Sequence, residues 1–495
     1  MKEITHKRRR PGINMLMILR ILGILLLFES GFTLVPLITS LIYGESDARA
    51  FAIATGATLA AGLSMTYLIK PRFSDMGKRE GFLLTSLVWV IFSLFGLIPF
   101  MIGSPGLNFT DAFFDSISAF TTTGASVLTD ISGISHGILV LRSLMQWIGG
   151  MGIILFTLAV IPMLNSSGGM QMFNAEVTGI THEKIRPRVS QTAMTLWVCY
   201  TLLTIVLTLL LWVGPMNLFD SFCHALSTMS TGGFTTNPDG INHWNSNYVK
   251  CVLIIFMFMG GVNFGMIYKV SIGDYRMIWR NEAFRAYVVT VLWATAAVTL
   301  IMIINGHYHS LQSGIIDTLF QVVSTISSTG YTISGVEHWG TPVMLIIFLL
   351  VFTGACAGST SGGSKLDRAI FMVKNIRNEM YRILHPNAVR SITFNNKVST
   401  PEVVNKVMVF MVIYIGIIIL GGFILMLFGK SMVDSLLTSL ACVSNADLGI
   451  GLEGFGGSYS AIAPVAKYTM ALLMLTGRLE LFTVLVLFTS AFWKR

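Results

Sequence analysis

The stretch DAFFDSISAFTTTGAS, residues 111–126, carries the pattern that decides the fold. An Asp opens a short apolar segment, two small residues lie inside that segment, and Gly124 follows thirteen residues after the Asp. The same pattern recurs without gaps at 220–235, 317–332 and 434–449. Its thirteenth position is then Gly233, Gly330 and Asp447. Four copies of one pattern at a spacing of about a hundred residues indicate an internal repeat.

The short segments are expected to be re-entrant helices. Each has about 10–12 residues, too few to cross a bilayer. Irregular backbone at membrane depth is tolerated only where it is buried in protein or lines water, so the loops after these helices would line a pore. We expect each Asp to be the N-cap of its helix, and the helix C-terminus to favour a cation at the loop. The alternative, an interfacial helix capped by Asp, would suit one copy better than four.

Four such hairpins around one axis would form an ion filter. Backbone carbonyls would replace the water shell of the ion, Gly would permit the required dihedrals, and Thr and Ser hydroxyls would brace the backbone. In the second copy Gly232 or Gly233 could lie at the axis, and the spacing from Asp220 favours Gly233. The filter residues predicted in this way are Thr122, Thr123, Gly124, Thr231, Gly232, Gly233, Ser328, Thr329, Gly330, Asn445, Ala446 and Asp447.

The composition places these loops in a membrane protein. Of 495 residues, 53% are hydrophobic and only 12% are charged, whereas a soluble domain carries about 25% charged residues. Long apolar runs recur along the whole chain and predict about ten spans, which leaves no room for a sizeable soluble domain. Neither a disulfide framework nor a CxxC metal site follows from the five scattered Cys. We expect no catalytic residues, because the spans offer few acids or bases, and no ATP-driven pump, because GxxxxGK[ST] does not occur.

The basic residues lie in alternate loops. The net charge is +9, and Lys and Arg gather in the first ten residues, in 70–79, in 184–188, in 269–285 and in 365–397. This is the positive-inside bias, which predicts that both termini are cytoplasmic. A nucleic-acid-binding surface would need a basic face on a folded domain, and we predict none. The basic start and first apolar run imitate a signal peptide, but they lack an A-x-A site and are predicted to be a retained span.

The predicted fold class is therefore an all-α polytopic membrane protein. Four span–pore helix–span repeats surround a central ion pore, and a two-helix hairpin precedes them. The predicted parts are the tail and hairpin in 1–78, repeat one in 79–188, repeat two in 189–282, repeat three with a cytoplasmic segment in 283–400, and repeat four in 401–495.

Three further motifs carry a resemblance to a known family. They are QWIGGMGI (146–153), GACAGSTSGGSK (354–365) and GRLELFT (477–483). With the four loops, they make the chain similar over nearly its whole length to the Trk/Ktr/HKT superfamily of potassium transporters, most closely to the bacterial TrkH-type membrane subunit. The resemblance implies potassium as the transported ion with no organic cofactor. It also implies a homodimer in the bacterial inner membrane, surrounded by lipid, and a cytoplasmic nucleotide-binding regulatory subunit of the TrkA type.

The glycine-rich segment is expected to interrupt a span, because each Gly inside a helix costs about 1 kcal/mol relative to Ala. Composition alone leaves a packing kink and a gate equally open, and the resemblance favours a gate below the filter. Arg478 lies in the last span, where a charge costs roughly 2.5–3.5 kcal/mol, and the resemblance places it under the filter. The alternative is a pair with Glu480, but residues two apart do not face each other on a helix. The gate residues predicted are Gly354, Gly358, Ser359, Thr360, Gly362, Gly363 and Arg478.

Asp447 departs from the family, which usually has Gly at this position. The Asp could adopt a left-handed backbone, or Gly449 could provide the turn instead, and a carboxylate could loosen the selectivity for potassium over sodium. Potassium uptake through a gated, channel-like pore is the predicted function. The alternatives are a cation-coupled secondary transporter, such as a symporter, and a less selective pathway for potassium and sodium. Residues 365–397 also predict an amphipathic helix that lies at lipid headgroups, docks a partner or is a solvated basic loop.

Overall fold

Helices make up almost all of the regular secondary structure in the described residues. The computed structural model describes residues 13–70, 77–128, 130–152, 189–306, 311–333, 336–388, 390–449 and 458–494. Within these ranges the only strands are β1 (Thr393–Phe394) and β2 (Lys397–Val398), which pair antiparallel. The predicted class, an all-α polytopic membrane protein, is confirmed. The predicted basic tail before residue 13 and the basic group 184–188 lie outside the described residues.

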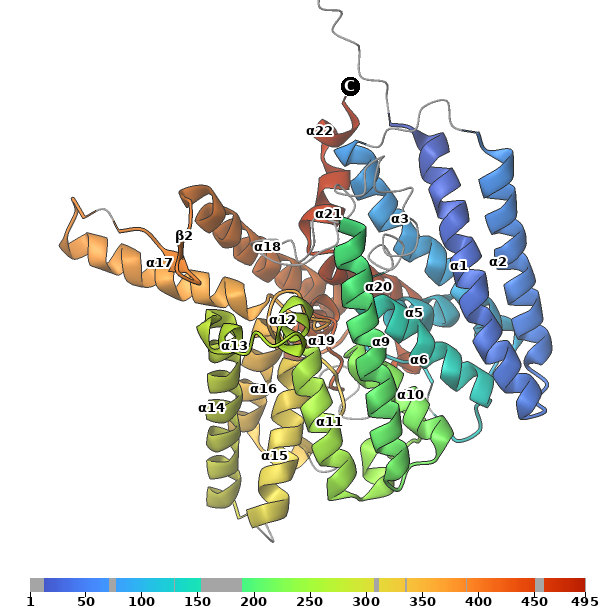
Figure 1. The fold of residues 1–495 in the computed structure, drawn as a ribbon, viewed down its shortest axis with the longest axis horizontal. Helices are drawn as coiled ribbons and strands as arrows, with labels where there is room; N and C mark the ends of the chain where they lie inside the picture. The colour runs from blue at the N-terminus through green and yellow to red at the C-terminus, as the bar shows by residue number, and fades with distance from the viewer. Residues whose placement is uncertain are drawn as a thin grey trace, which may run out of the picture.

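Two long helices open the described chain as a hairpin. α1 (Met15–Ile42) and α2 (Ala48–Leu68) pack against each other and lie at one side of the molecule (Figure 1). The turn between them holds Glu45, whose carboxylate accepts hydrogen bonds from the amides of His136 (2.6 Å) and Gly137 (3.2 Å). These amides begin α6 (His136–Gly150) and have no acceptor inside that helix. The Glu45 carboxylate therefore joins the hairpin to the rest of the fold.

Four units follow, each with a first span, a short helix and a closing helix. The first spans are α3 (Lys78–Gly96) with α4 (Ile98–Ile102), α9 (Val189–Val213), α14 (Glu282–Ile304) and α18 (Pro401–Met426). The short helices are α5 (Phe109–Phe120), α10 (Leu218–Met229), α15 (Leu311–Ile326) and α19 (Met432–Ser444). The closing helices are α6, α11 (Asn247–Gly260) with α12 (Phe264–Ser271), α16 (Thr341–Thr353), and α20 (Pro464–Arg478) with α21 (Phe482–Leu485).

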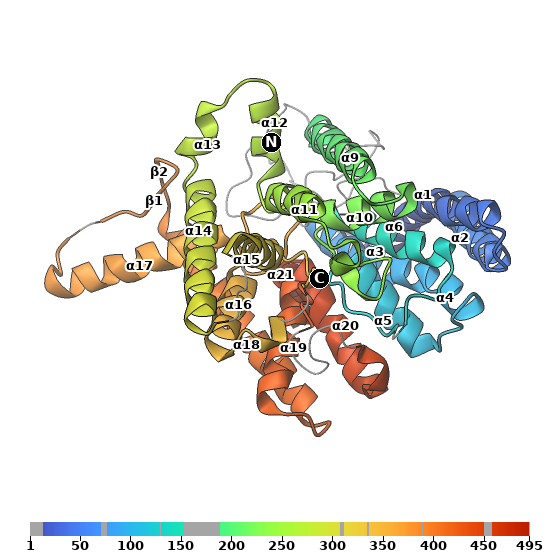
Figure 2. The ribbon, with the colours of Figure 1, turned by 90° about the horizontal axis from the view of Figure 1, so that it is seen from below.

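The units form a closed circle. The closing helix of each unit packs on the short helix of the next, α6 on α10, α11 on α15, α16 on α19 and α20 on α5. In Figure 2 the four short helices lie around the middle of the molecule, with the longer helices outside them. Four loops from distant parts of the chain are thus brought to one place.

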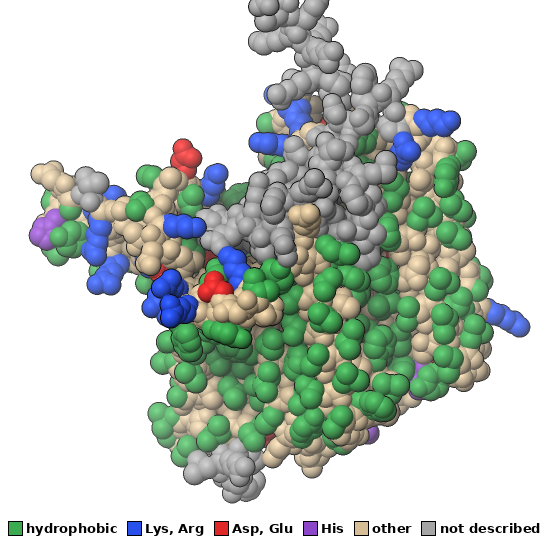
Figure 3. All heavy atoms as spheres, viewed as in Figure 1, with side chains coloured by type: hydrophobic (Ala, Val, Ile, Leu, Met, Phe, Trp, Pro, Cys, Tyr) green, Lys and Arg blue, Asp and Glu red, His purple; other side chains and the backbone are tan. Residues whose placement is uncertain are grey.

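The outside of the molecule is suited to lipid. Among the described residues, six helices are long and apolar enough to cross a membrane, and two further pairs qualify if each bent pair counts as one span. Figure 3 shows hydrophobic side chains over the lower part of the visible face, while Lys and Arg gather around α17 (Leu366–Leu384) and along the upper edge. The two described ends of the chain lie at one end of the molecule, because Asn14 contacts Glu80 and Arg79 contacts Lys494.

Smaller elements connect these helices. They are α13 (Arg276–Arg280) and α22 (Ser490–Trp493), with the 3-10 turns η2 (Gly240–Trp244), η3 (Val336–His338), η4 (Tyr459–Ala461) and η5 (Val486–Phe488). The helix predicted within 365–397 is α17, which projects from the body in Figure 1 and ends before the β1–β2 hairpin.

The predicted N-caps are wrong. In α5, α10 and α19 the capping side chains are Asn108, Asn217 and Ser431, each three residues before the predicted Asp. The Asp lies in the first turn, where its carboxylate accepts a hydrogen bond from the cap, as Asp111 does from Asn108 Nδ2 at 2.9 Å. This reciprocal arrangement resembles a capping box. In the third unit α15 begins at Leu311, so Asp317 lies inside the helix.

Candidate functional site: a ring of four loops above a glycine-rich segment

The four loops after the short helices begin with the same backbone turn, and we call them the ring loops (121–126, 230–235, 327–332 and 444–449). Two residues before the thirteenth position, each loop holds a non-glycine residue with positive φ: Thr122 (57°), Thr231 (56°), Ser328 (55°) and Asn445 (48°). The predicted glycines follow with φ of 88° at Gly124, 80° at Gly233 and 88° at Gly330. L-residues rarely adopt such angles. All four loops therefore share an uncommon turn at their start, and the first three also share the glycine that follows it.

The ring loops touch one another in chain order. A Cβ built on Gly124 would lie 2.5 Å from the Gly232 carbonyl oxygen, and one on Gly233 would lie 2.1 Å from that of Thr329. One on Gly330 would lie 2.5 Å from the carbonyl oxygen of Asp447. The amide of Asp447 completes the circle by donating to the Thr123 carbonyl at 2.8 Å. The predicted filter residues are thus brought together in a closed ring.

The fourth loop departs from the other three. Asp447 does not have a positive φ, whereas Gly449 does, at 63°. The turn therefore falls two residues later, which is the second of the two possibilities left open by the sequence. As a result the carbonyl of Asp447, rather than that of Ala446, lies beside Gly330. In addition, the Asp447 amide donates a hydrogen bond to the Thr123 carbonyl. The ring has three similar quadrants and one different quadrant.

Buried side chains brace the ring loops from behind. In the first unit the Asp115 carboxylate accepts a hydrogen bond from the Val127 amide at 2.9 Å. In the third unit Gln321, at the equivalent position, accepts one from the Ile333 amide at 3.4 Å. The Asp115 carboxylate also lies 3.3 Å from Arg142 Nε, and both side chains are buried. Because a buried charge needs a partner, this pair ties α6 to the first loop.

Gln146 braces the second loop from a neighbouring unit. Its Nε2 donates to the Gly232 carbonyl at 2.7 Å, and its Oε1 accepts from Ser227 Oγ at 2.7 Å. A Cβ on Gly232 would lie 2.3 Å from the Gln146 side-chain carbon, which explains the second glycine of this loop. Gln146 is part of the motif QWIGGMGI, from which no role was predicted for it. The signal that could have found it is a polar amide side chain within an apolar run.

The glycine-rich segment, residues 354–363, lies against the C-terminal ends of the short helices. Gly362 N donates to Ser328 Oγ at 2.5 Å and Gly363 N to the Ser444 carbonyl at 2.9 Å. Thr360 Oγ1 contacts the Met229 carbonyl at 3.1 Å. A Cβ on Gly362 would lie 1.7 Å from the Ser444 carbonyl oxygen, so only glycine fits. The predicted gate residues Gly354, Gly358, Ser359, Thr360, Gly362 and Gly363 lie together in this segment.

Arg478, predicted to lie within the last span, is at the break between the two helical parts of that bent pair. It is the last residue of α20, and the chain bends by 112° before α21. Its Nη1 donates to the Thr360 carbonyl at 3.0 Å and its Nη2 to the Gly150 carbonyl at 2.7 Å. The guanidinium therefore connects the glycine-rich segment to the end of α6. A similar bend of 106° separates α11 from α12, and neither bend was predicted from the sequence.

Charged side chains surround the far side of the glycine-rich segment. Lys365 is buried and its ammonium donates to the Ser361 carbonyl. Arg368 pairs with Glu480, donates to the Ser364 carbonyl at 2.9 Å and lies over the Phe410 ring. These groups, with Arg478, line a cavity of about 390 Å³. Glu480, for which no role was predicted, thus joins α17 to the bend after α20.

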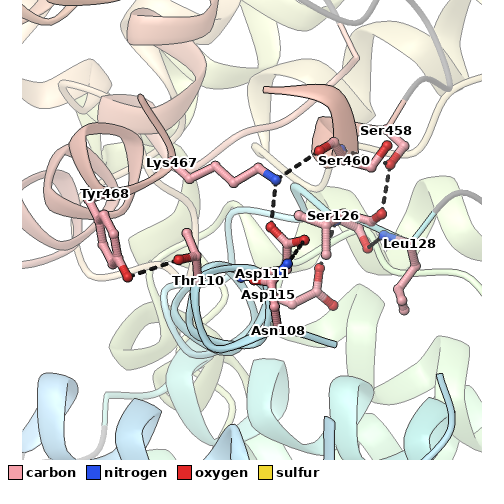
Figure 4. Close-up of polar contacts among 11 residues, drawn as sticks. Asn108, Thr110, Asp111, Asp115, Ser126, Leu128, Ser458, Ser460, Lys467 and Tyr468 are labelled. Carbon is pink, nitrogen blue, oxygen red and sulfur yellow. Dashed lines mark hydrogen bonds and ion pairs between the residues drawn. The ribbon is translucent and has the colours of Figure 1, made fainter. Parts of the chain in front are cut away.

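The outer edge of the ring is joined between the fourth and first units. Lys467 Nζ on α20 pairs with Asp111 of α5 at 2.5 Å and donates to the Ser460 carbonyl at 2.9 Å (Figure 4). Tyr468 bonds Thr110 nearby at 3.0 Å. A second pair of the same kind, Lys250 with Asp317 at 2.6 Å, joins α11 to α15. In the described part of the chain no group of three or more His, Cys, Asp or Glu side chains could hold a metal ion.

Comparisons with known proteins agree with this architecture. The profile of the family described as "TrkH: Cation transport protein" matches residues 48–495. The chain is 36% identical to the Trk system potassium uptake protein TrkH of Escherichia coli K12 over 96% of this chain and 99% of that protein. It is 32% identical to the protein of that name from Halomonas elongata, over 98% and 100%. The crystal structure of the potassium transporter TrkH from Vibrio parahaemolyticus superimposes with a TM-score of 0.88 at 29% identity, covering 97% of this chain and 100% of that one.

Proposed function

The chain belongs to the TrkH family of cation transport proteins, and from this we propose that it takes up potassium across the bacterial inner membrane through a channel-like pore. The membership confirms the predicted family and the prediction that the chain is a transport protein and not an enzyme. The observation that carries the proposal is the closed ring of four loops, each of which holds a left-handed residue two positions before the thirteenth. Such a ring can offer an ion several oxygens in place of water.

In this proposal the ring is the selectivity filter. Its residues are those of the four ring loops, from Thr122 to Gly124, from Thr231 to Gly233, from Ser328 to Gly330 and from Asn445 to Asp447. Braced loops would keep the same set of backbone oxygens available to the ion. The buried braces Asp115, Gln146 and Gln321 support this role.

We further propose that the glycine-rich segment is a gate below this filter, with Arg478 holding it. The support is contact: the segment bonds the ends of three short helices, and the Arg478 guanidinium bonds its Thr360 carbonyl. A membrane potential would drive the ion inward, at about 2.3 kcal/mol per charge per 100 mV. Opening would require these hydrogen bonds to break together.

The surroundings of the pore are proposed from the family resemblance and the charge pattern. Both termini would be cytoplasmic, two copies would form a homodimer, and a nucleotide-binding subunit of the TrkA type would bind the cytoplasmic face, where α17 projects. The domain boundaries of the sequence analysis are proposed as the limits of the four repeats. The different fourth quadrant makes a less selective pathway for potassium and sodium the second candidate.

The test is cation flux into liposomes that hold the purified full-length chain. Potassium, rubidium and sodium are compared at a fixed membrane potential with no proton gradient, and Asp447→Gly is measured in parallel. We expect potential-driven potassium flux that exceeds sodium flux. Equal sodium flux that is corrected by the glycine would favour the less selective pathway. Flux that requires a second ion gradient would replace the channel-like mechanism with a coupled transporter or symporter.

A further inference from the structure

The carboxylate of Asp447 poses a problem that a glycine at that position would not. A carboxylate carries a full charge, and the attraction between two charges grows as their separation falls. A free carboxylate at the ring therefore stabilises the smaller sodium ion more than potassium. Backbone carbonyls, which carry no net charge, discriminate less strongly in this direction. A filter that contains Asp447 needs a device that restrains this charge.

The structure places the carboxylate in contact with two donors. Asp447 Oδ1 accepts from the Gly449 amide at 2.9 Å and from the Tyr459 hydroxyl at 3.2 Å. Two hydrogen bonds to one carboxylate oxygen weaken the attraction between that oxygen and a cation. They also fix the direction of the side chain. In the fourth loop the residue with positive φ is Gly449 instead of residue 447. The amide of this same glycine is one of the two donors to the Asp447 carboxylate.

Tyr459 is itself held against the first unit, so its hydroxyl is a rigid donor. Its side chain is 2% exposed and its ring lies 5.5 Å from that of Phe114 on α5. Its amide donates to the Ser126 carbonyl at 3.0 Å, and the preceding Ser458 Oγ donates to the Val127 carbonyl at 2.8 Å. Figure 4 shows Ser458 and Ser126 at this seam between the fourth and first units. The donor is thus fixed by the first ring loop, the one that the fourth loop contacts to close the circle.

We propose that Tyr459 is a positioning residue that determines cation specificity, because its hydroxyl restrains the Asp447 carboxylate and keeps the ring selective for potassium over sodium. This rests on the proposed function of the ring as a filter. Tyr459 acts through Asp447 and is assigned no contact with the ion. Its effect must therefore depend on the carboxylate, which separates this role from a contribution to folding.

The experiment measures the ratio of potassium to sodium flux in liposomes for the full-length chain and for Tyr459→Phe. The Phe ring keeps the packing on Phe114 and loses only the hydroxyl. We expect the ratio to fall by roughly twofold to tenfold, the range that corresponds to the net free energy of one hydrogen bond. In the Asp447→Gly background, and in Asp447→Asn, the same Tyr459→Phe substitution is expected to leave the ratio unchanged, since no charge remains to be restrained.

The matched control is Tyr468→Phe. Tyr468 lies on α20 at the same edge of the molecule, and its hydroxyl bonds Thr110 and not a ring residue. We expect no change of ratio. An unchanged ratio in Tyr459→Phe would overturn the inference while leaving the potassium pore intact. A fall of equal size in the Asp447→Gly and Asp447→Asn backgrounds would also overturn it, because the role would then be structural. Absence of any potassium flux from the unsubstituted chain would overturn the pore proposal itself and the inference with it.

Discussion

At the residue scale, Gly233 is required in the ring for two separate reasons. Its φ of 80° disfavours any residue with a Cβ, and a Cβ there would lie 2.1 Å from the Thr329 carbonyl oxygen. The left-handed backbone alone costs an L-residue about 1–2 kcal/mol. The overlap with a rigid backbone atom adds to this cost, because the third loop is itself braced by Gln321.

Gly233→Ala is therefore expected to lower potassium flux by about tenfold or more, since each 1.4 kcal/mol is a factor of ten. The matched control is Gly416→Ala in α18, where a new Cβ meets no other atom within 4 Å. Ala at that helical position is expected to keep flux unchanged and to raise stability slightly. Flux and the melting temperature in detergent are measured for both. Full flux from Gly233→Ala would contradict the role of the ring.

At the element scale, one ion pair links the projecting helix α17 to the bend after α20. Arg368 pairs with Glu480, and Glu480 and Leu481 have positive φ of 54° and 53°. Non-glycine residues rarely adopt this backbone conformation, which costs about 1–3 kcal/mol and persists only when its surroundings enforce it. The pair is partly buried, so its loss leaves Arg368 without its partner beside the glycine-rich segment.

Glu480→Gln is accordingly expected to loosen the proposed gate and to raise potassium flux severalfold in the absence of a regulatory subunit. The control is Glu379→Gln, which removes an exposed pair with Arg382 on the same helix α17. Exposed pairs contribute about 0–1 kcal/mol, so this variant should behave as the unsubstituted chain. Equal flux from both variants would show that the Arg368–Glu480 pair does not hold the segment.

Long and short helices differ in how well the sequence predicts them. The spans and the four short helices follow directly from apolar runs and from the repeated pattern, because both depend on local sequence. The glycines at 124, 233 and 330 follow for the same reason. The partners of Gln146 and Glu480 lie 86 and 112 positions away in the chain, and the Tyr459 ring and amide are held by the first unit. No periodicity can show such contacts.

The prediction that the four Asp residues are N-caps was wrong for a different reason. An Asp before an apolar run is compatible with the N-cap and with the third position of the first turn, since both favour an acidic side chain. Asn108, three residues upstream of Asp111, is the better cap and decides between the two. The predicted start of each of these helices was therefore about one helical turn too late in the chain.

At the scale of the whole molecule, the described structure predicts which parts of the surface face each side of the membrane. Asn396 lies in the turn between β1 and β2 at the end where basic residues gather, and Asp239 lies just before η2 in the loop after the second short helix. Both are exposed. We expect Asn396→Cys to react with a membrane-impermeant maleimide only in inverted vesicles, and Asp239→Cys only in intact cells, relative to the unsubstituted chain. Reaction of both variants from the same side would contradict the proposed orientation.

The different fourth quadrant has a consequence for stoichiometry. If four identical subunits formed this ring, an acidic residue at the thirteenth position would occur four times, and four carboxylates would repel one another around a single ion. Because one polypeptide supplies all four loops, the carboxylate of Asp447 occurs only once in the ring. A single tyrosine, Tyr459, can therefore donate a hydrogen bond to it. When the four loops belong to one chain, a substitution can change a single loop. In a ring of four identical subunits the same substitution would change all four loops.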